Sequence, residues 1–116
     1  MADPSPQPFH LEELPGSRPG GRVLRLSGPL LMSSLFPFQR AVRSNDRPHL
    51  VLDFTAVPYL DSAGLGAVVG AYVTHNQNGR SLALVGVNDR IRNLFKATHV
   101  DQFFRFFPTV TEAEQA

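Results

Sequence analysis

Residues 49–76, "HLVLDFTAVPYLDSAGLGAVVGAYVTHN", contain the two segments that decide the fold. The first six residues (49–54) are nearly all apolar, which is typical of a strand buried on both faces of a sheet. From residue 63 to 76, apolar side chains recur with the period of an amphipathic helix, at Leu65, Val68, Val69, Tyr72 and Val73. A buried strand that leads into such a helix predicts a domain of the α/β class.

The segments on both sides of this unit continue the alternation. Four of them are expected to be strands, each bounded by turn residues: 9–14 at an edge, 22–26, 81–87 and 103–107. Three further helices each have a candidate N-cap: Ser33 or Ser34 before a helix that buries Leu35, Phe38 and Val42, Asn88 before one that buries Ile91, Leu94 and Phe95, and Thr109, with Glu112, before a short final helix.

This order of elements predicts a single α/β domain over residues 9–116, with a mostly parallel sheet, an antiparallel edge strand and about four helices. Residues 1–8 are rich in proline and are expected to form a disordered leader.

Composition narrows the classes of function. The chain has 116 residues, a net charge of +1 and no run of like charges, so nothing indicates a nucleic-acid partner. Its longest apolar run, residues 67–73, is far shorter than the roughly 20 residues of a membrane span. Cysteine is absent, which excludes disulfides and suits a reducing compartment. We therefore expect a cytoplasmic protein without direct nucleic-acid contact or membrane insertion; its oligomeric state stays open between monomer and weak dimer.

The stretch "LDSAGLG" at residues 60–66 places an acid, a hydroxyl and two glycines at the expected start of the central helix. The first N–H groups of a helix have no partner within the helix and carry partial positive charge. Asp61 or Ser62 can cap these groups, which alone would explain the motif. The same groups would also stabilise a phosphate on Ser62, and Gly64 and Gly66 would leave room for a modifying enzyme. The spacing is compatible with both a cap and a phosphorylation site.

The outward positions of the same helix have no charged residue. They are Ala63, Gly66, Ala67, Gly70, Ala71 and Thr74. A helix face in contact with water normally carries Lys or Glu, so this surface of small residues is typical of a docking face for another protein. The alternative is that the face packs inside the protein against a neighbouring helix, through a close contact at Gly66 and Gly70.

Residues 50–72 closely resemble the central segment of the STAS domain, specifically of the anti-sigma factor antagonists of bacterial regulation. Residues 23–30, "VLRLSGPL", resemble the second strand of that family and the glycine after it, and residues 86–113 resemble its closing helix–strand–helix. The most specific part of the resemblance is D-S-x-G-L-G after a buried strand. The resemblance implies a STAS domain over residues 9–116.

In that family the serine that matches Ser62 is phosphorylated by an anti-sigma factor that is also a serine kinase. The resemblance implies that the unmodified protein binds the anti-sigma factor and frees the sigma factor, that phosphorylation of Ser62 ends this binding, and that a phosphatase restores it. The expected partner-binding surface comprises Asp61, Ser62, Ala63, Gly64, Gly66, Ala67, Gly70 and Ala71. The alternative is a STAS interaction module of a larger signalling assembly or transporter complex, or one that binds a nucleotide.

One segment departs from the family. Where the family commonly has Gly-Glu-Leu-Asp after the second strand, this chain has Gly28-Pro29-Leu30-Leu31. A carboxylate that helps to present the phosphorylated serine is therefore missing. Leu31 and Met32 would instead make this rim more apolar.

The sequence does not indicate an enzyme. A catalytic Ser62 would need a base within hydrogen-bonding distance, whereas His75 lies thirteen positions along the same helix, or roughly 20 Å away. His10, His49 and His99 are scattered along the chain, and a catalytic role for His49 or His99 would depend on the fold bringing them to Ser62. The glycines from residue 64 to 70 do not match the spacing of a dinucleotide fingerprint, so no cofactor is expected.

Acidic residues do not indicate a metal site either. Asp46, Asp53 and Asp61 are seven or eight positions apart and belong to different elements. Asp53 follows the buried strand and lies near the start of the helix. It is expected to order the loop around Ser62, with a solvated acid at a strand end as the alternative.

Overall fold

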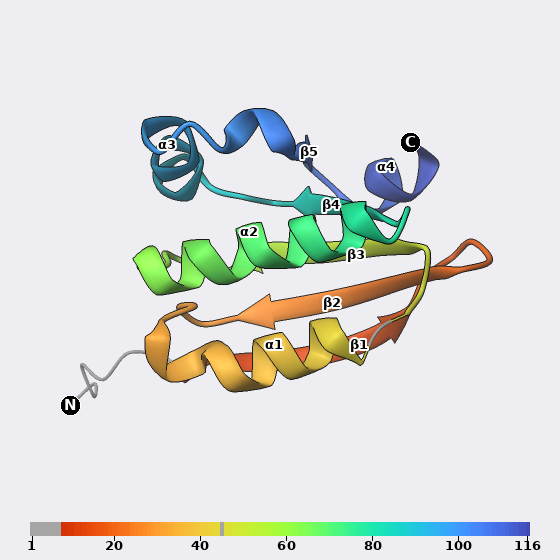
Figure 1. The fold of residues 1–116 in the computed structure, drawn as a ribbon, viewed down its shortest axis with the longest axis horizontal. Helices are drawn as coiled ribbons and strands as arrows, with labels where there is room; N and C mark the ends of the chain where they lie inside the picture. Colours follow the sequence, from red (N-terminus) through yellow and green to blue (C-terminus); the bar gives the residue numbers. More distant parts are fainter. Residues whose placement is uncertain (1–7, 45) are drawn as a thin grey trace.

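The computed structural model describes residues 8–44 and 46–116, which form a five-stranded sheet with helices on both faces (Figure 1). The strands lie in the sheet in the order of the sequence: β1 (His10–Pro15), β2 (Gly21–Ser27), β3 (His49–Ala56), β4 (Ser81–Val85) and β5 (Arg105–Phe107). β1 is antiparallel to β2, and the other neighbouring strands are parallel. The predicted α/β fold, with its antiparallel edge strand, is confirmed. The predicted leader, apart from Pro8, lies outside the described residues.

Four α-helices and two short 3-10 helices connect the strands: η1 (Met32–Ser34), α1 (Leu35–Arg43), α2 (Ser62–Gln77), α3 (Asp89–Ala97), η2 (Asp101–Phe103) and α4 (Val110–Gln115). Side chains alternate between the two faces of each strand. On β4, Leu82 and Leu84 join the core under α1, α2 and α3, whereas Ala83 and Val85 pack with Ala113 of α4. The first three α-helices therefore cover one face of the sheet, and α4 covers part of the other.

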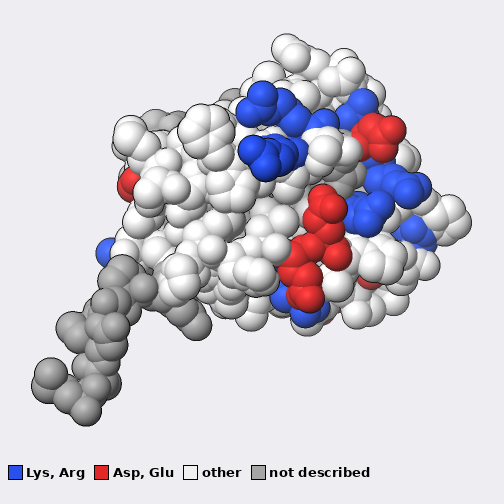
Figure 2. All heavy atoms as spheres, turned by 90° about the horizontal axis from the view of Figure 1, so that it is seen from below, with Lys and Arg blue, Asp and Glu red and all other residues white. Residues whose placement is uncertain are grey.

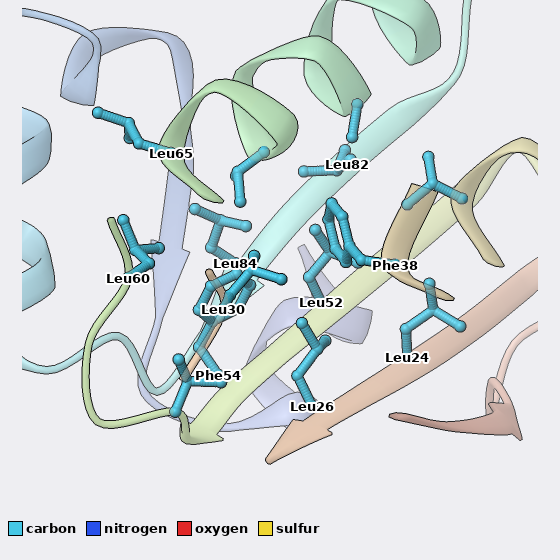
Figure 3. Packing of buried hydrophobic residues seen from close by; sticks show 14 of the residues in the cluster. Leu24, Leu26, Leu30, Phe38, Leu52, Phe54, Leu60, Leu65, Leu82 and Leu84 are labelled. Carbon is cyan, nitrogen blue, oxygen red and sulfur yellow. The ribbon is translucent and has the colours of Figure 1, made fainter. Parts of the chain in front are cut away.

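The larger core lies between the sheet and the helices α1 to α3, and Figure 3 shows its leucines and phenylalanines meeting there. The register places Leu24 of β2, Leu52 of β3 and Leu84 of β4 side by side, and all three are completely buried. Phe38 of α1 and Leu65 of α2 close this layer from the helix side. Burial of apolar surface of this extent is the main stabilising contribution to a domain of this size.

The buried face of α2 is rotated about the helix axis relative to the apolar face predicted from the sequence. Its buried positions are Gly64, Leu65, Val68, Ala71 and His75, whereas Val73, predicted to be in the core, is 42% exposed. The prediction of the buried face was based on the large apolar residues alone. Small residues and a histidine face the sheet as well, and they shift the buried face.

Two predicted boundaries and one predicted capping bond also differ from the structure. β4 ends at Val85 and not at residue 87, because Gly86 adopts a positive φ of 69° that turns the chain away from the sheet. β5 begins at Arg105, after a 3-10 turn in place of the expected strand start at Phe103. Ser34 occupies the N-cap position of α1, but its hydroxyl donates to the carbonyl of Pro29 and does not cap the helix. No helix within the described ranges is long and apolar enough to cross a membrane.

Candidate functional site

Ser62 is the first residue of α2, just beyond the carboxyl end of β3 (Figure 1). After β3, the chain turns through a hydrogen bond from the N–H of Val57 to the carbonyl of Phe54, 2.9 Å long. Val57 and Leu60 are buried and fix the path of this connection. The side chain of Ser62 is exposed, and its hydroxyl forms no hydrogen bond within the described part of the chain.

Asp61, and not Ser62, caps α2. Its Oδ1 accepts a hydrogen bond of 2.7 Å from the N–H of Gly64, and its Oδ2 accepts one of 3.1 Å from the N–H of Met32. These two bonds favour the ionised carboxylate and hold the pKa of Asp61 below its usual value of 3.8. Because Asp61 satisfies the capping requirement, the hydroxyl of Ser62 is left free for other chemistry.

The sequence suggested that Gly64 leaves open space beside Ser62, but the structure shows that it does not. A Cβ on Gly64 would lie 2.2 Å from the carbonyl oxygen of Leu30, so the segment after β2 passes directly against the first turn of α2. Leu30 is completely buried and forms a parallel bridge with Leu60. The glycine is needed for this close approach of two backbones, and it is not part of an accessible surface.

The outward face of α2 lines an open groove between α1 and α2, with a volume of about 460 Å³. Gly66 and Gly70 lie along it, and a Cβ on either would have no other atom within 4 Å. The alternative of a close internal helix contact at these two glycines is therefore wrong. The other α2 residues along the groove are Ala63, Ala67, Ala71 and Thr74, and of these Ala71 is buried at the bottom with only 5% exposure.

The α1 side of the groove is formed by three apolar residues, by the polar Gln39 and by one cation, Arg43. No acidic residue of the described chain lines it. The groove opens toward Ser62 at the end formed by Leu35 and Ala63. In Figure 2, which shows the protein from below the view of Figure 1, most charged side chains lie toward the right, the end opposite the start of α2.

Two large apolar side chains are exposed between the end of β2 and the first turn of α1. Met32 is 72% exposed and Phe36 is 76% exposed. Met32 is linked to the site through its hydrogen bond to Asp61. The sequence predicted an apolar rim at Leu31 and Met32; Phe36, exposed on α1 beside Arg40, is a further apolar residue that the sequence did not single out.

The carboxylate of Asp53 does not contact the loop around Ser62, which it was expected to order. It is buried within β3, where its Oδ1 accepts hydrogen bonds from the N–H (3.0 Å) and hydroxyl (2.6 Å) of Thr55. Its Oδ2 lies 3.7 Å from Nε of Arg25 on β2. Both interactions hold the end of the sheet together on the face opposite α2, so Asp53 does not bind the loop that precedes Ser62.

None of the histidines forms a hydrogen bond with Ser62 in the described part of the chain. His75 is buried, and its Nδ1 bonds to the carbonyl of Ala71 at 3.0 Å. His49 begins β3, at the opposite end of that strand from the α2 start, and bonds to Ser81. His99 follows the last turn of α3. Among the described residues, no group of three or more potential ligands could hold a metal ion.

Comparisons with known proteins agree with this architecture. The model of the STAS domain family matches residues 13–113. The anti-sigma-B factor antagonist of Staphylococcus aureus is 35% identical over 79 residues, which cover 68% of this chain and 69% of the relative. The anti-sigma-B factor antagonist of Listeria monocytogenes is 45% identical over 49 residues, 42% of this chain and 43% of that protein.

Solved structures show the same fold. An anti-sigma factor antagonist from Mycobacterium paratuberculosis superposes with a TM-score of 0.77 and 24% identity, over 91% of this chain and 92% of that one. Unphosphorylated SpoIIAA, also an anti-sigma factor antagonist, gives a TM-score of 0.71 and 17% identity over 93% and 95% of the two chains. From the family match and from these relatives, we conclude that the chain belongs to the STAS domain family, in which it groups with the anti-sigma factor antagonists.

Proposed function

We propose that this protein is an anti-sigma factor antagonist that binds an anti-sigma factor over Ser62 and the groove between α1 and α2, and that phosphorylation of Ser62 ends this binding. The observation that carries the proposal is the exposed hydroxyl at the first turn of α2, which forms no hydrogen bond to any described residue, in a chain related to anti-sigma-B factor antagonists. The proposed partners are an anti-sigma factor with serine kinase activity and a phosphatase, which would act on the protein in the cytoplasm.

Other hydroxyls are less suited to modification. The hydroxyl of Ser34 is buried and donates to Pro29, that of Thr55 donates to Asp53, and that of Thr98 donates to carbonyls at the end of α3. A kinase would have to break each of these hydrogen bonds before transfer. Ser62 requires no such step, and the partial positive charge of the helix N-terminus favours an added phosphate.

The charge of the phosphate gives a direct way to switch binding off. It carries about −1.5 to −2 charges at neutral pH. Inside a dry contact without a basic partner, such a group would incur a desolvation penalty of several kcal/mol. A loss of about 4 kcal/mol corresponds to roughly a thousandfold in affinity. The small uncharged residues along the groove suit a closely packed contact of this kind.

The family's acidic residues after β2 are absent here, and the rim that replaces them is apolar. Asp61 is the carboxylate that remains beside Ser62, and it is engaged as the helix cap. We propose that the anti-sigma factor contacts Met32 and Phe36 through apolar side chains, which would distinguish this pair from pairs that rely on acidic residues at this rim.

The test is to incubate the protein with the anti-sigma factor that it binds and with ATP, to map phosphate by mass spectrometry, and to measure affinity by calorimetry. We expect phosphate on Ser62 alone and a loss of affinity of about a thousandfold. Ser62→Ala should bind the partner normally and should not be switched off. Phosphate on Ser34, Thr55 or Thr98 with Ser62 unmodified would overturn the proposal.

A further inference from the structure

The carboxylate of Asp61 joins two segments that are distant in the sequence. One oxygen accepts from Gly64 within α2, and the other accepts from Met32, at the start of η1. The bond to Gly64 is 2.7 Å long and the bond to Met32 is 3.1 Å long. One ionised side chain therefore holds both the phosphorylation site and the rim beside it.

The rim segment has firm anchors on either side of this bond. Before it, Leu30 donates from its N–H to the carbonyl of Tyr59 (3.2 Å) and accepts from the N–H of Asp61 (3.3 Å). After it, the buried Ser34 is held by Pro29. Between these anchors Met32 has its side chain in solvent, and its backbone N–H bonds only to Asp61 within the described residues. The Asp61–Met32 bond is therefore the direct link between the exposed rim and the start of α2.

A phosphate on Ser62 would compete with Asp61 for the same helix terminus. The N–H groups of Gly64 and Leu65 already bond to the side chain and the carbonyl of Asp61. The hydrogen bonds from Gly64 and Met32 also lower the pKa of Asp61, so its carboxylate is ionised when the second anion is added. Repulsion between neighbouring like charges displaces the group that is held less firmly. Of the two bonds of Asp61, the one to Met32 is the longer, and it is the one that joins separate segments.

We propose that Asp61 is a positioning residue that couples the phosphorylation state of Ser62 to the rim: phosphorylation breaks the Asp61–Met32 hydrogen bond and releases the segment between Leu30 and Ser34 that presents Met32. This inference rests on the proposed function, because it assumes that Ser62 is phosphorylated. The switch then acts at two places, by placing charge in the contact and by loosening the apolar rim next to it.

The experiment measures the exchange of individual backbone amide hydrogens by NMR in the full chain. Phosphoserine is incorporated during translation at position 62 or, as a matched control, at position 44. Ser44 is exposed and lies at the opposite end of α1, so it adds the same charge away from Asp61. We expect the amide of Met32 to exchange about tenfold faster, or more, with phosphoserine at position 62, because a hydrogen bond to a charged group contributes that much. Phosphoserine at position 44 should leave it unchanged.

Asp61→Asn separates the two bonds of the carboxylate. The Asn oxygen can still cap α2 at Gly64, but its amide nitrogen cannot accept from Met32. This variant should show fast exchange at Met32 and a protected Gly64 amide without any phosphate. Adding phosphoserine at position 62 to Asp61→Asn should give no further increase at Met32.

Two results would overturn the proposal. The first is a Met32 amide that stays protected when Ser62 carries phosphate, including the case in which the phosphate itself becomes the acceptor. The second is a full tenfold increase on phosphorylation of Asp61→Asn. Affinity for the anti-sigma factor is measured separately on the same proteins. Failure to bind that partner would overturn the proposed function and would leave the exchange result at Met32 intact.

Discussion

Helices α2 and α3 begin in the same way, each after a parallel strand, and then present different surfaces. Asp61 caps α2 by accepting from Gly64 at 2.7 Å, and Asn88 caps α3 by accepting from Ile91 at 2.8 Å. The second polar side-chain atom of each capping residue forms a hydrogen bond with a neighbouring segment of the chain. The oxygen of Asp61 reaches Met32, whereas the nitrogen of Asn88 donates to the carbonyl of Pro58 at 3.0 Å.

Beyond the caps, the outward sides of the two helices differ. α3 has Asp89 at its first position and exposes Arg90, Asn93 and Lys96. It is a helix whose outer face is suited to water. α2 has Ser62 at its first position, and its outer face is made of glycine and alanine along a groove. Since both helices share one scaffold, the absence of charge on α2 is not a requirement of the fold, and it supports the partner surface proposed above.

The largest expected effect comes from adding charge to that outer face. Gly70→Arg should weaken binding of the anti-sigma factor by about 3 kcal/mol, more than a hundredfold, because an unpaired charge would be buried in the contact. The matched control is Asn93→Arg on α3, which should bind normally. Circular dichroism should show both variants folded, since both positions are exposed.

The result with either variant can contradict the proposed difference between the outer faces of α2 and α3. Normal binding by folded Gly70→Arg would mean that the groove is not the interface. An equal loss with Asn93→Arg would mean that α3 belongs to the interface as well.

A second prediction concerns the third position of the two helices, which is Gly64 in α2 and the buried Ile91 in α3. Gly64→Ala should lower the free energy of unfolding by about 2–3 kcal/mol, because the added Cβ would force the backbone at Leu30 to move. Gly66→Ala should raise it by about 0.5–1 kcal/mol, because nothing obstructs the methyl group and alanine favours the helix. Urea unfolding measures both. If Gly64→Ala were as stable as wild type, the close contact with Leu30 would be wrong.

The order of elements could be predicted from the sequence because each element has its own local signal. The apolar run of β3, the alternation in β2 and the cap residues Asp61, Asn88 and Thr109 all lie where the structure has the corresponding elements. Pairing and handedness then follow from general rules for parallel sheets. The antiparallel edge strand, and the position of Ser62 at the start of α2, were both predicted from the sequence.

Features that depend on long-range contacts could not be predicted. Nothing local shows that Gly64 is needed for the approach of Leu30, which is more than thirty positions away. Asp53 appeared to belong to the Ser62 loop, but strand alternation turns it to the opposite face, toward Arg25. Phe36 could have been noticed as an aromatic residue on the polar side of α1, but its exposure became clear only once α1 was placed on the sheet.

The two helices also differ in the residues that they bury in the core, and this difference has the smallest expected effect. Phe95 of α3 is completely buried and apolar, whereas α2 buries His75. The Nδ1 of His75 lies 3.0 Å from the carbonyl of Ala71, so this nitrogen carries the hydrogen and donates it. The other ring nitrogen, Nε2, is buried without a hydrogen-bond partner in the described part of the chain. Protonation would place a second donor there with nothing to accept from it.

Burial therefore lowers the pKa of His75 below its usual value of 6.5, and the charge of Arg80 acts in the same direction, against the hydrogen bond to Ala71. Below pH 6.5 the unfolded chain binds a proton at this residue before the folded protein does, so the folded state loses stability as the pH falls from 6.5 to the lowered pKa. The slope can reach at most about 1.4 kcal/mol per pH unit. Urea unfolding of wild type and His75→Leu between pH 5 and pH 8 isolates this contribution, because the other histidines are present in both proteins. The free energy of unfolding of wild type should fall relative to that of His75→Leu below pH 6.5 and should run parallel to it above pH 7. Parallel curves over the whole range would show that the folded protein accommodates the proton on His75, and that α2 is no more sensitive to pH than α3.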